Sequence, residues 1–274
     1  MADQLASMRV ERPVLEVRGL TMAFGGIRAL DGFDLHLRQG EIAALIGPNG
    51  AGKTTFFNCL TGMYRPTAGE LLLTPPRGET RRLNGLKPNQ ITEQGLARTF
   101  QNIRLFPRMS VLENVMVGRH CRTRSGVIGA VFRGPATRHE EEETVRRSHQ
   151  ILTTMGLTGQ ENELARNLPY GAQRRLEIAR ALATDPLVLL LDEPAAGMNP
   201  QETRELDELI CRLRDGGLSI LLIEHDMKLV MSLSDHIFVM DYGRKIAEGT
   251  PSAVRANPEV IRAYLGGEES HGPA

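Results

Sequence analysis

Residues 47–54 combine glycines with a lysine and a threonine in the full pattern GxxxxGK[ST], between a predicted strand and a predicted helix. Glycines let the backbone wrap around phosphate groups, and the N-terminus of the following helix adds a favourable dipole. Lys53 is expected to reach the β- and γ-phosphates and the Thr54 hydroxyl to coordinate Mg²⁺. A chance glycine turn is the alternative, which the flanking strand and helix disfavour. The residues expected to bind the nucleotide are Gly47, Pro48, Asn49, Gly50, Ala51, Gly52, Lys53, Thr54 and Thr55.

Two carboxylates follow the leucine-rich run at residues 187–191. Ligands of open α/β sheets bind at the carboxyl ends of the strands, where Asp192 and Glu193 are expected to lie. Asp192 suits the coordination shell of magnesium, and Glu193 suits a general base that polarises the attacking water. An acidic pair alone is usually a polar strand end or a helix cap. Together with the phosphate loop, the pair indicates a nucleoside triphosphatase.

Two further polar residues, Gln101 and His225, each follow a short apolar stretch that could end near the same ligand edge. Each is weak evidence alone, because a single histidine at a strand end is more often structural. Their value depends on whether the elements around them form one sheet.

The elements that must position these residues alternate between strands and helices, which predicts a parallel sheet covered on both faces. Residues 15–37 are instead short apolar stretches broken by glycines, and they predict a small antiparallel sheet. The predicted strands are 41–46, 187–191, 219–223 and 236–240, and the predicted helices are 53–60, 172–183, 201–214 and 227–233.

The central region, residues 98–165, is expected to be an inserted helical subdomain. Ser110 is the expected N-cap of a helix over 111–117. Residues 119–138 hold five arginines without periodic apolar residues, which favours a solvated loop. Further expectations are an exposed connection over 74–89 and helices over 91–97 and 140–155.

Bulk composition limits the classes of protein. Lys plus Arg and Asp plus Glu both number 33, so no global field favours nucleic acid. The three cysteines, Cys59, Cys121 and Cys211, lack the spacing of a zinc site or a disulfide framework. The apolar runs are far shorter than the roughly 20 residues that span a bilayer, and the start lacks the apolar core of a signal peptide. The chain is therefore expected to remain in the cytoplasm.

These motifs follow one another in the order and spacing of an ABC-transporter ATPase cassette, which the chain resembles over residues 14–265. The resemblance implies an α/β P-loop NTPase fold: a mostly parallel sheet flanked by helices, an N-terminal antiparallel β subdomain and the helical subdomain at about 98–165. It leaves tails at 1–13 and 266–274. Within the family the chain looks most like LivG-type subunits of branched-chain amino acid importers, on residues 98–101, 174–180, 195–200, 224–228 and 260–265.

The resemblance also implies roles for single residues. Phe24 would stack on adenine, although an ordinary core phenylalanine is the alternative. Gln101 would touch Mg²⁺ and the attacking water, and His225 would contact the γ-phosphate. Residues 168–173, with Gly171 among them, would close over the ATP held by a second cassette.

Two positions depart from the family pattern. Pro169 stands where the signature usually has serine, and proline offers neither a hydroxyl nor an N–H to a phosphate. Contact would then depend on Gly171 and the following helix N-terminus. Asn199 replaces the usual aspartate of the loop after the acidic pair. An asymmetric dimer with a different cassette is a hypothesis that follows.

The implied partners are two transmembrane permease subunits, a second ATP-binding cassette and, indirectly, a solute-binding protein, at the cytoplasmic face of the inner membrane and without nucleic acid. Motion would pass to the membrane subunits through the surface around Gln101, residues 104–108 and the helical subdomain. Alternatives are the cassette of a lipopolysaccharide-type exporter and a soluble ABC ATPase. A kinase or GTPase is disfavoured because no NKxD motif is present. Cargo and direction of transport stay open.

Overall fold

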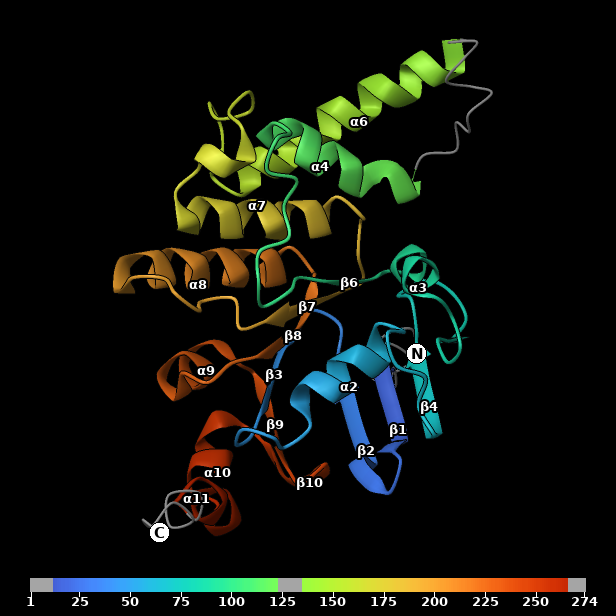
Figure 1. Ribbon diagram of the computed structural model, residues 1–274, viewed down its shortest axis with the longest axis vertical. Helices are drawn as coiled ribbons and strands as arrows, with labels where there is room; N and C mark the ends of the chain where they lie inside the picture. The colour runs from blue at the N-terminus through green and yellow to red at the C-terminus, as the bar shows by residue number, and fades with distance from the viewer. Residues whose placement is uncertain (1–11, 123–134, 266–274) are drawn as a thin grey trace, which may run out of the picture. The chain divides into compact units, whose positions relative to one another are not determined.

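The computed structural model describes residues 12–122 and 135–265, and Figure 1 shows their helices and strands. The chain forms two compact units. The first unit comprises Met1–Pro88 and Cys211–Ala274, and the second unit comprises Asn89–Ile210.

The first unit contains an antiparallel sheet in the order β2-β1-β4-β5. This confirms the antiparallel sheet predicted from residues 15–37. The predicted connection after residue 74 is less open than expected, because it contains β5 and the buried Leu83, whose N–H donates to the carbonyl of Leu71 at 2.8 Å. The strands are β1 (Leu15–Phe24), β2 (Ile27–Leu37), β4 (Ala68–Leu73) and β5 (Arg81–Arg82).

A second set of strands in the first unit has the order β10-β9-β3-β8. β3 pairs in parallel with both β8 and β9, whereas β10 pairs antiparallel with β9. Every residue of β3 and β8 is buried, as expected for strands of a parallel sheet. The strands are β3 (Ile42–Ile46), β8 (Ser219–Ile223), β9 (His236–Asp241) and β10 (Arg244–Gly249).

The described residues of the first unit also form helices. α2 buries Phe56 and Phe57, and α9 is capped by Asp226, whose side chain accepts from the N–H groups of Lys228 and Leu229. Both helices match the predicted bounds, whereas β10, α10 and α11 were not predicted. The helices are α2 (Lys53–Leu60), α9 (Met227–Leu233), α10 (Pro251–Arg255) and α11 (Pro258–Leu265).

In the second unit β6 (Leu96–Arg98) pairs in parallel with β7 (Val188–Asp192). The helix predicted over 91–97 is wrong at its end, because α3 (Pro88–Gln94) stops before Gly95 and a strand follows. Gly95 has φ +110°, and a Cβ there would lie 2.9 Å from the Leu187 side chain. Its carbonyl accepts from the N–H groups of Leu187 and Val188, which draws the next residues into the sheet.

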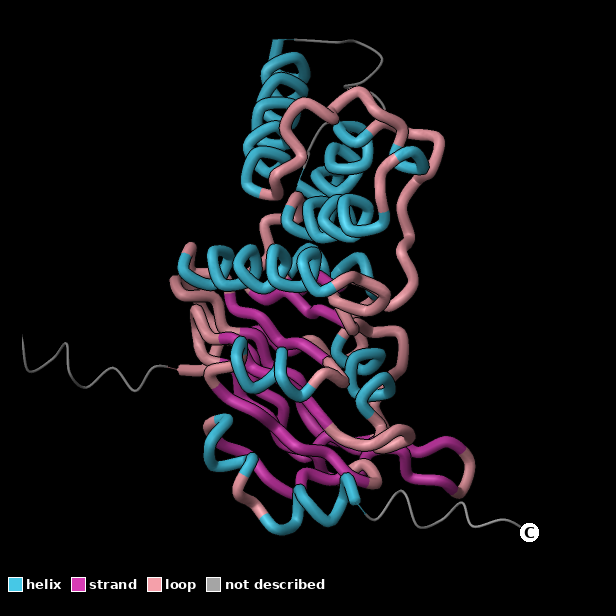
Figure 2. Tube along the Cα trace, turned by 90° about the vertical axis from the view of Figure 1, so that its left-hand side faces the viewer, coloured by secondary structure: helices cyan, strands magenta, loops and turns pink. Residues whose placement is uncertain are grey.

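The described residues between 111 and 182 form helices and loops without a strand, as Figure 2 shows. α4 packs against both α6 and α7. The approach of α4 to α7 is close, since a Cβ at Gly118 would lie 2.3 Å from the Arg180 carbonyl oxygen. The bounds predicted for the inserted subdomain, 98–165, stay a prediction. The helices are α4 (Val111–Arg119), α6 (Pro135–Thr154), α7 (Tyr170–Leu182) and α8 (Pro200–Asp215).

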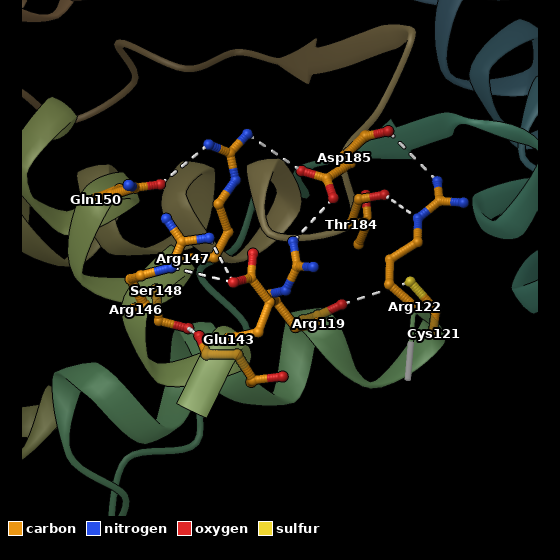
Figure 3. A network of polar contacts seen from close by, with 12 residues as sticks. Arg119, Cys121, Arg122, Glu143, Arg146, Arg147, Ser148, Gln150, Thr184 and Asp185 are labelled. Carbon is orange, nitrogen blue, oxygen red and sulfur yellow. Dashed lines mark hydrogen bonds and ion pairs between the residues drawn. The ribbon is translucent and has the colours of Figure 1, made fainter. Parts of the chain in front are cut away.

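The arginines at the end of α4 are not simply solvated, which corrects the expectation for the described part of residues 119–138. Arg119 forms an ion pair with Asp185 at 2.8 Å, and Arg122 donates to the Thr184 carbonyl at 2.6 Å (Figure 3). Arg147 of α6 reaches the other oxygen of Asp185 at 3.5 Å. These arginines tie α4 and α6 to the turn after α7. Residues 123–134 lie outside the described residues, and residues 135–138 belong to α6.

Ser110 confirms the predicted N-cap of α4. Its hydroxyl accepts from the Glu113 N–H at 3.1 Å, and the Glu113 carboxylate accepts from the Ser110 N–H at 2.7 Å. Ser110→Ala is expected to lower the free energy of unfolding by about 1 kcal/mol, because it leaves a helix N–H without its cap. Urea unfolding measures this value. Ser252→Ala is the control, because Thr250 and not Ser252 caps the first turn of α10. An equal loss of stability in this variant would contradict the assignment of Ser110 as the N-cap of α4.

Cys59 is buried on α2, and burial raises the pKa of its thiol to about 12. The reactive thiolate is therefore scarce at pH 8. In a variant with Cys121 and Cys211 changed to serine, we expect a thiol reagent to label Cys59 far more slowly in the folded protein than in denaturant. Equal labelling rates in the two states would show that α2 opens readily.

No helix within residues 12–122 and 135–265 is both long enough and apolar enough to cross a membrane.

Candidate nucleotide site

The phosphate loop connects β3 to α2 and depends on two glycines with positive φ. A Cβ at Gly47 would lie 2.0 Å from the Met240 carbonyl oxygen, and a Cβ at Gly52 would lie 2.6 Å from the Ala29 carbonyl oxygen. Any side chain at either position would therefore push the loop away from its support. A Cβ built at Gly50 would have nothing within 4 Å, so the exposed part of the loop has open space beside its backbone.

Lys53 lies over this loop rather than extending into solvent. Its ammonium donates to the carbonyls of Gly47 at 2.6 Å and Pro48 at 3.0 Å, and the side chain is buried. No side chain caps α2 at Gly52, while Thr54 is exposed on the first turn. The geometry leaves a positive charge and helix N–H groups beside the loop, a suitable environment for phosphate.

Two other residues of the first unit bear on nucleotide binding. Phe24 ends β1 with 43% of its surface exposed and its ring edge-to-face with Tyr64, so it is not the core phenylalanine of the alternative interpretation. His225 is exposed between β8 and α9, and its backbone N–H donates to the Glu224 carboxylate at 3.1 Å. Stacking by Phe24 and phosphate contact by His225 stay predictions.

Tyr264 of α11 is a contact that sequence reasoning did not predict. Burial raises the pKa of its phenol to about 12, and the nearby backbone N–H of Gly47 opposes this rise. The C-terminal helix therefore lies close to the start of the phosphate loop. The sequence signal was the closing run at residues 260–265, which contains Tyr264 and indicated the subfamily but no contact.

The second unit contains the acidic pair. Asp192 ends β7 and forms an ion pair with Arg98 at the end of β6, at 2.6 Å, with both side chains 7% exposed. The parallel pairing of β6 and β7 places these two ends at one edge of the sheet. The Arg98 guanidinium offsets part of the cost of burying the Asp192 carboxylate. Sequence reasoning identified Asp192 but not this partner.

Glu193 lies one residue beyond the strand with φ +48°, a left-handed conformation that costs about 1–2 kcal/mol outside glycine. Its carboxylate accepts from the Gln101 side-chain amide at 2.8 Å. Two residues 92 positions apart in the chain, Gln101 and Glu193, are thus brought into direct contact, which the sequence did not predict. Strain at such a residue is typical of active sites.

The signature stretch enters α7 directly. Pro169 is the residue before the helix, and Gly171 lies in its first turn, where a Cβ would come 2.7 Å from the Glu202 carboxylate. Tyr170, in place of the first signature glycine, donates its hydroxyl to the Ala196 carbonyl at 2.9 Å. The departure at this position therefore adds a contact with the loop that follows Glu193.

Asn199 keeps a structural role that an aspartate would also fill. Its side-chain oxygen accepts from the N–H groups of Gln201 at 2.9 Å and Glu202 at 3.0 Å, and the Glu202 carboxylate accepts from the Asn199 N–H at 3.0 Å. Asparagine and aspartate are comparable N-caps, so α8 begins equally well with either residue.

The predicted ligands suit magnesium and a nucleoside triphosphate by their chemistry. Thr54 of the first unit carries a hydroxyl oxygen, and Gln101 and Asp192 of the second unit carry amide and carboxylate oxygens, the hard ligands that Mg²⁺ prefers. The loop at residues 47–55 supplies the N–H groups and the lysine that phosphates need. When bound, magnesium would neutralise phosphate charge and polarise the γ-phosphoryl group.

Comparison with known proteins agrees with this geometry. The family pattern for ABC transporter matches residues 30–196, and the pattern for the branched-chain amino acid ATP-binding cassette transporter matches residues 244–270. A solved ATP-binding cassette of an ABC transporter in its ADP conformation is 31% identical, with a TM-score of 0.80, and the match covers 93% of this chain and 99% of that one. The chain therefore belongs to the ATP-binding cassette family of ABC transporters, which confirms the predicted fold.

The curated relatives give a finer position within this family. The high-affinity branched-chain amino acid transport ATP-binding protein LivG of Salmonella typhimurium is 52% identical over 258 residues, covering 94% of this chain and 99% of the relative. Its counterpart BraF of Pseudomonas aeruginosa is 49% identical with the same coverage. The subfamily resemblance is confirmed, and the chain is an ATP-hydrolysing enzyme that binds nucleotide.

Proposed function

We propose that this chain hydrolyses ATP to energise the uptake of branched-chain amino acids, or of related small amino-acid or amide solutes, through separate membrane subunits. The names of relatives about 50% identical over nearly their whole length support the cargo class. The observation that carries the enzymatic part is the contact of Gln101 with Glu193 at 2.8 Å, because it pairs the proposed base with a water-orienting amide.

Each site residue has a distinct proposed role. Lys53 and the N–H groups of the phosphate loop bind the phosphates, and Phe24 stacks on the adenine. Glu193 accepts a proton from the attacking water, which the Gln101 amide orients. His225 donates to the γ-phosphate and stabilises the charge that develops there.

Magnesium ligation is part of the same proposal. Thr54, Gln101 and Asp192 are the proposed ligands. Arg98 orients the Asp192 carboxylate through their 2.6 Å ion pair. Replacing Asp192 by asparagine would raise the magnesium concentration needed for half-maximal activity, because amides bind Mg²⁺ less strongly than carboxylates.

The proposed partners follow from the proposed function. A cassette with no spanning helix among its described residues needs two transmembrane permease subunits to move a solute. A second cassette completes the dimer in which Gly171 and the α7 N-terminus close over the opposite nucleotide. A solute-binding protein takes part indirectly, and the chain works at the cytoplasmic face of the inner membrane.

The replacement at Pro169 supports an asymmetric dimer. A proline before α7 offers no hydroxyl or N–H to a γ-phosphate, so the composite site built with this signature is proposed to be the weaker one. A different second cassette with a complete signature would then serve the stronger site. A fully active homodimer of this chain in the assembled transporter would contradict the asymmetry.

Purification of the tagged chain from its own membranes in mild detergent tests the partners. We expect two multi-spanning proteins and a second cassette to co-purify with vanadate-sensitive ATPase activity. A parallel preparation of the Glu193→Gln variant should recover the same proteins without the activity. Recovery of soluble partners alone would contradict the transporter assignment.

A further inference from the structure

Arg174 is a fully buried arginine on α7, with 0% of its side chain exposed. It belongs to the subfamily string at residues 174–180, to which the proposed mechanism assigns no role. Burial of a guanidinium costs several kcal/mol unless good hydrogen bonds compensate. What Arg174 binds therefore indicates why such a residue is present.

The guanidinium of Arg174 holds two consecutive backbone carbonyls of the segment that follows β6. Nη1 donates to the Phe100 oxygen at 2.7 Å, and Nη2 donates to the Gln101 oxygen at 2.8 Å. Nη1 also contacts the buried Glu177 carboxylate at 2.9 Å. The planar fork of arginine suits this arrangement, since a lysine ammonium cannot reach two carbonyls in the same geometry.

Other residues on the same face of α7 continue the attachment. The second oxygen of Glu177 accepts from the Arg104 N–H at 3.2 Å, and Arg180 donates to the Arg104 carbonyl. Residues 174, 177 and 180 recur at a spacing of three, so they share one face of the helix. The main chain from residue 100 to residue 104 is thus fixed to α7 by side chains with charge-assisted hydrogen bonds.

This attachment leads to the proposed catalytic base. The side chain of Gln101, whose carbonyl Arg174 holds, donates to Glu193 at 2.8 Å. In the loop after Glu193, the Ala196 carbonyl accepts from the Tyr170 hydroxyl at 2.9 Å, and Arg174 Nη2 lies 3.5 Å from the same hydroxyl. One guanidinium therefore contacts both Gln101 and Tyr170, whose side chains bond to Glu193 and to the loop after it.

We infer that Arg174 is a positioning residue for ATP hydrolysis, which fixes the Gln101 main chain so that the Gln101 side chain holds Glu193 in place. The inference rests on the proposed roles of Gln101 and Glu193. Arg174 is fully buried and donates to main-chain carbonyls, so it acts on catalysis through Gln101. We expect the loss of Arg174 to lower the rate of ATP hydrolysis and not the affinity for ATP, because the phosphate loop lies in the other unit.

Arg174→Met removes the two carbonyl contacts and is the first variant to measure. We expect kcat to fall by about 100-fold, the size of effect that displacement of a catalytic group by about 1 Å produces. The Kd for ATP should stay within about threefold of the wild-type value. Arg175→Met is the matched control, because Arg175 is its neighbour on α7 but pairs with the surface residue Glu205 at 3.2 Å.

Loss of stability is separated from loss of positioning by a double variant. Arg174→Met combined with Glu177→Met replaces a buried ion pair with apolar side chains, a change that often leaves stability unchanged or raised. We expect it to melt close to the wild type yet to keep the low kcat. Arg174→Lys keeps the charge beside Glu177 but not the fork, and an intermediate kcat is expected.

A double variant with wild-type stability and wild-type kcat would overturn the inference. So would a fall in ATP affinity that accounts for the whole loss of activity in Arg174→Met. An inactive wild-type assembly would instead contradict the proposed function. Normal turnover in Glu193→Gln would contradict the proposed base, and neither result depends on the Arg174 variants.

Discussion

Glu193→Gln is expected to lower kcat by about 10²–10⁴-fold, the range that general base catalysis contributes, while ATP binding is kept. Glutamine has the same shape as glutamate but cannot accept a proton from water. Gln101, which donates to the Glu193 carboxylate, can still donate to the amide oxygen of the new side chain. Steady-state hydrolysis measures kcat, and calorimetry with ATP measures the Kd.

Glu205→Gln is the matched control for this change. It removes the same charge from an exposed residue on α8 that pairs with Arg175 at the surface. We expect its kcat to stay within a factor of about 2, because surface ion pairs contribute little. If Glu193→Gln retained wild-type kcat, Glu193 would not be the base.

Lys53→Met is expected to weaken ATP binding by at least about 30-fold, since loss of a hydrogen-bonded buried charge costs about 2–5 kcal/mol. The lysine already lies over the loop, with its ammonium at 2.6 Å from the Gly47 carbonyl oxygen. Little side-chain ordering is then needed when phosphate binds. The methionine keeps the apolar stem and its packing but not the charge.

Lys245→Met is the control for Lys53→Met, because Lys245 pairs with Glu248 on the exposed side of β10. Circular dichroism and the melting temperature show whether each variant folds. A folded Lys53→Met protein with wild-type ATP affinity would contradict the role of this loop in phosphate binding.

Those parts of the fold that depend on hydrophobic pattern and local signals could be predicted. The strand before the phosphate loop, α2 and α9 match their predicted bounds to within one residue, because apolar runs and caps such as Asp226 define them locally. The N-cap of α4 at Ser110 was predicted for the same reason. Local signals of this kind need no partner elsewhere in the chain.

Elements that depend on distant partners could not be predicted. β6 forms because Gly95 and Leu187, far apart in sequence, bond to each other, so the helix expected there ends early. Arg119 and Arg122 were predicted to be solvated charges. In the fold they bind Asp185 and the Thr184 carbonyl, respectively. A charge run in sequence carries no information about such partners.

The residues of the site differ in the same way: some have a local sequence pattern, and others depend on distant partners. The phosphate loop and the pair Asp192–Glu193 have patterns with a chemical reason, and sequence alone identified them. The supporting residues Arg98 and Arg174 belong to the subfamily strings at 98–101 and 174–180, but those strings indicate no chemical role for them. Their roles follow from burial and from the groups they touch, which only the fold determines.

The central claim is that ATP hydrolysis by this chain energises the uptake of branched-chain amino acids. The most direct test replaces the chromosomal copy with Glu193→Gln and measures uptake of radiolabelled leucine, isoleucine and valine at low concentration, with protein levels matched by immunoblot. We expect high-affinity uptake of all three to fall to the level of a strain without the chain. Unchanged uptake of all three in both strains would contradict the claim.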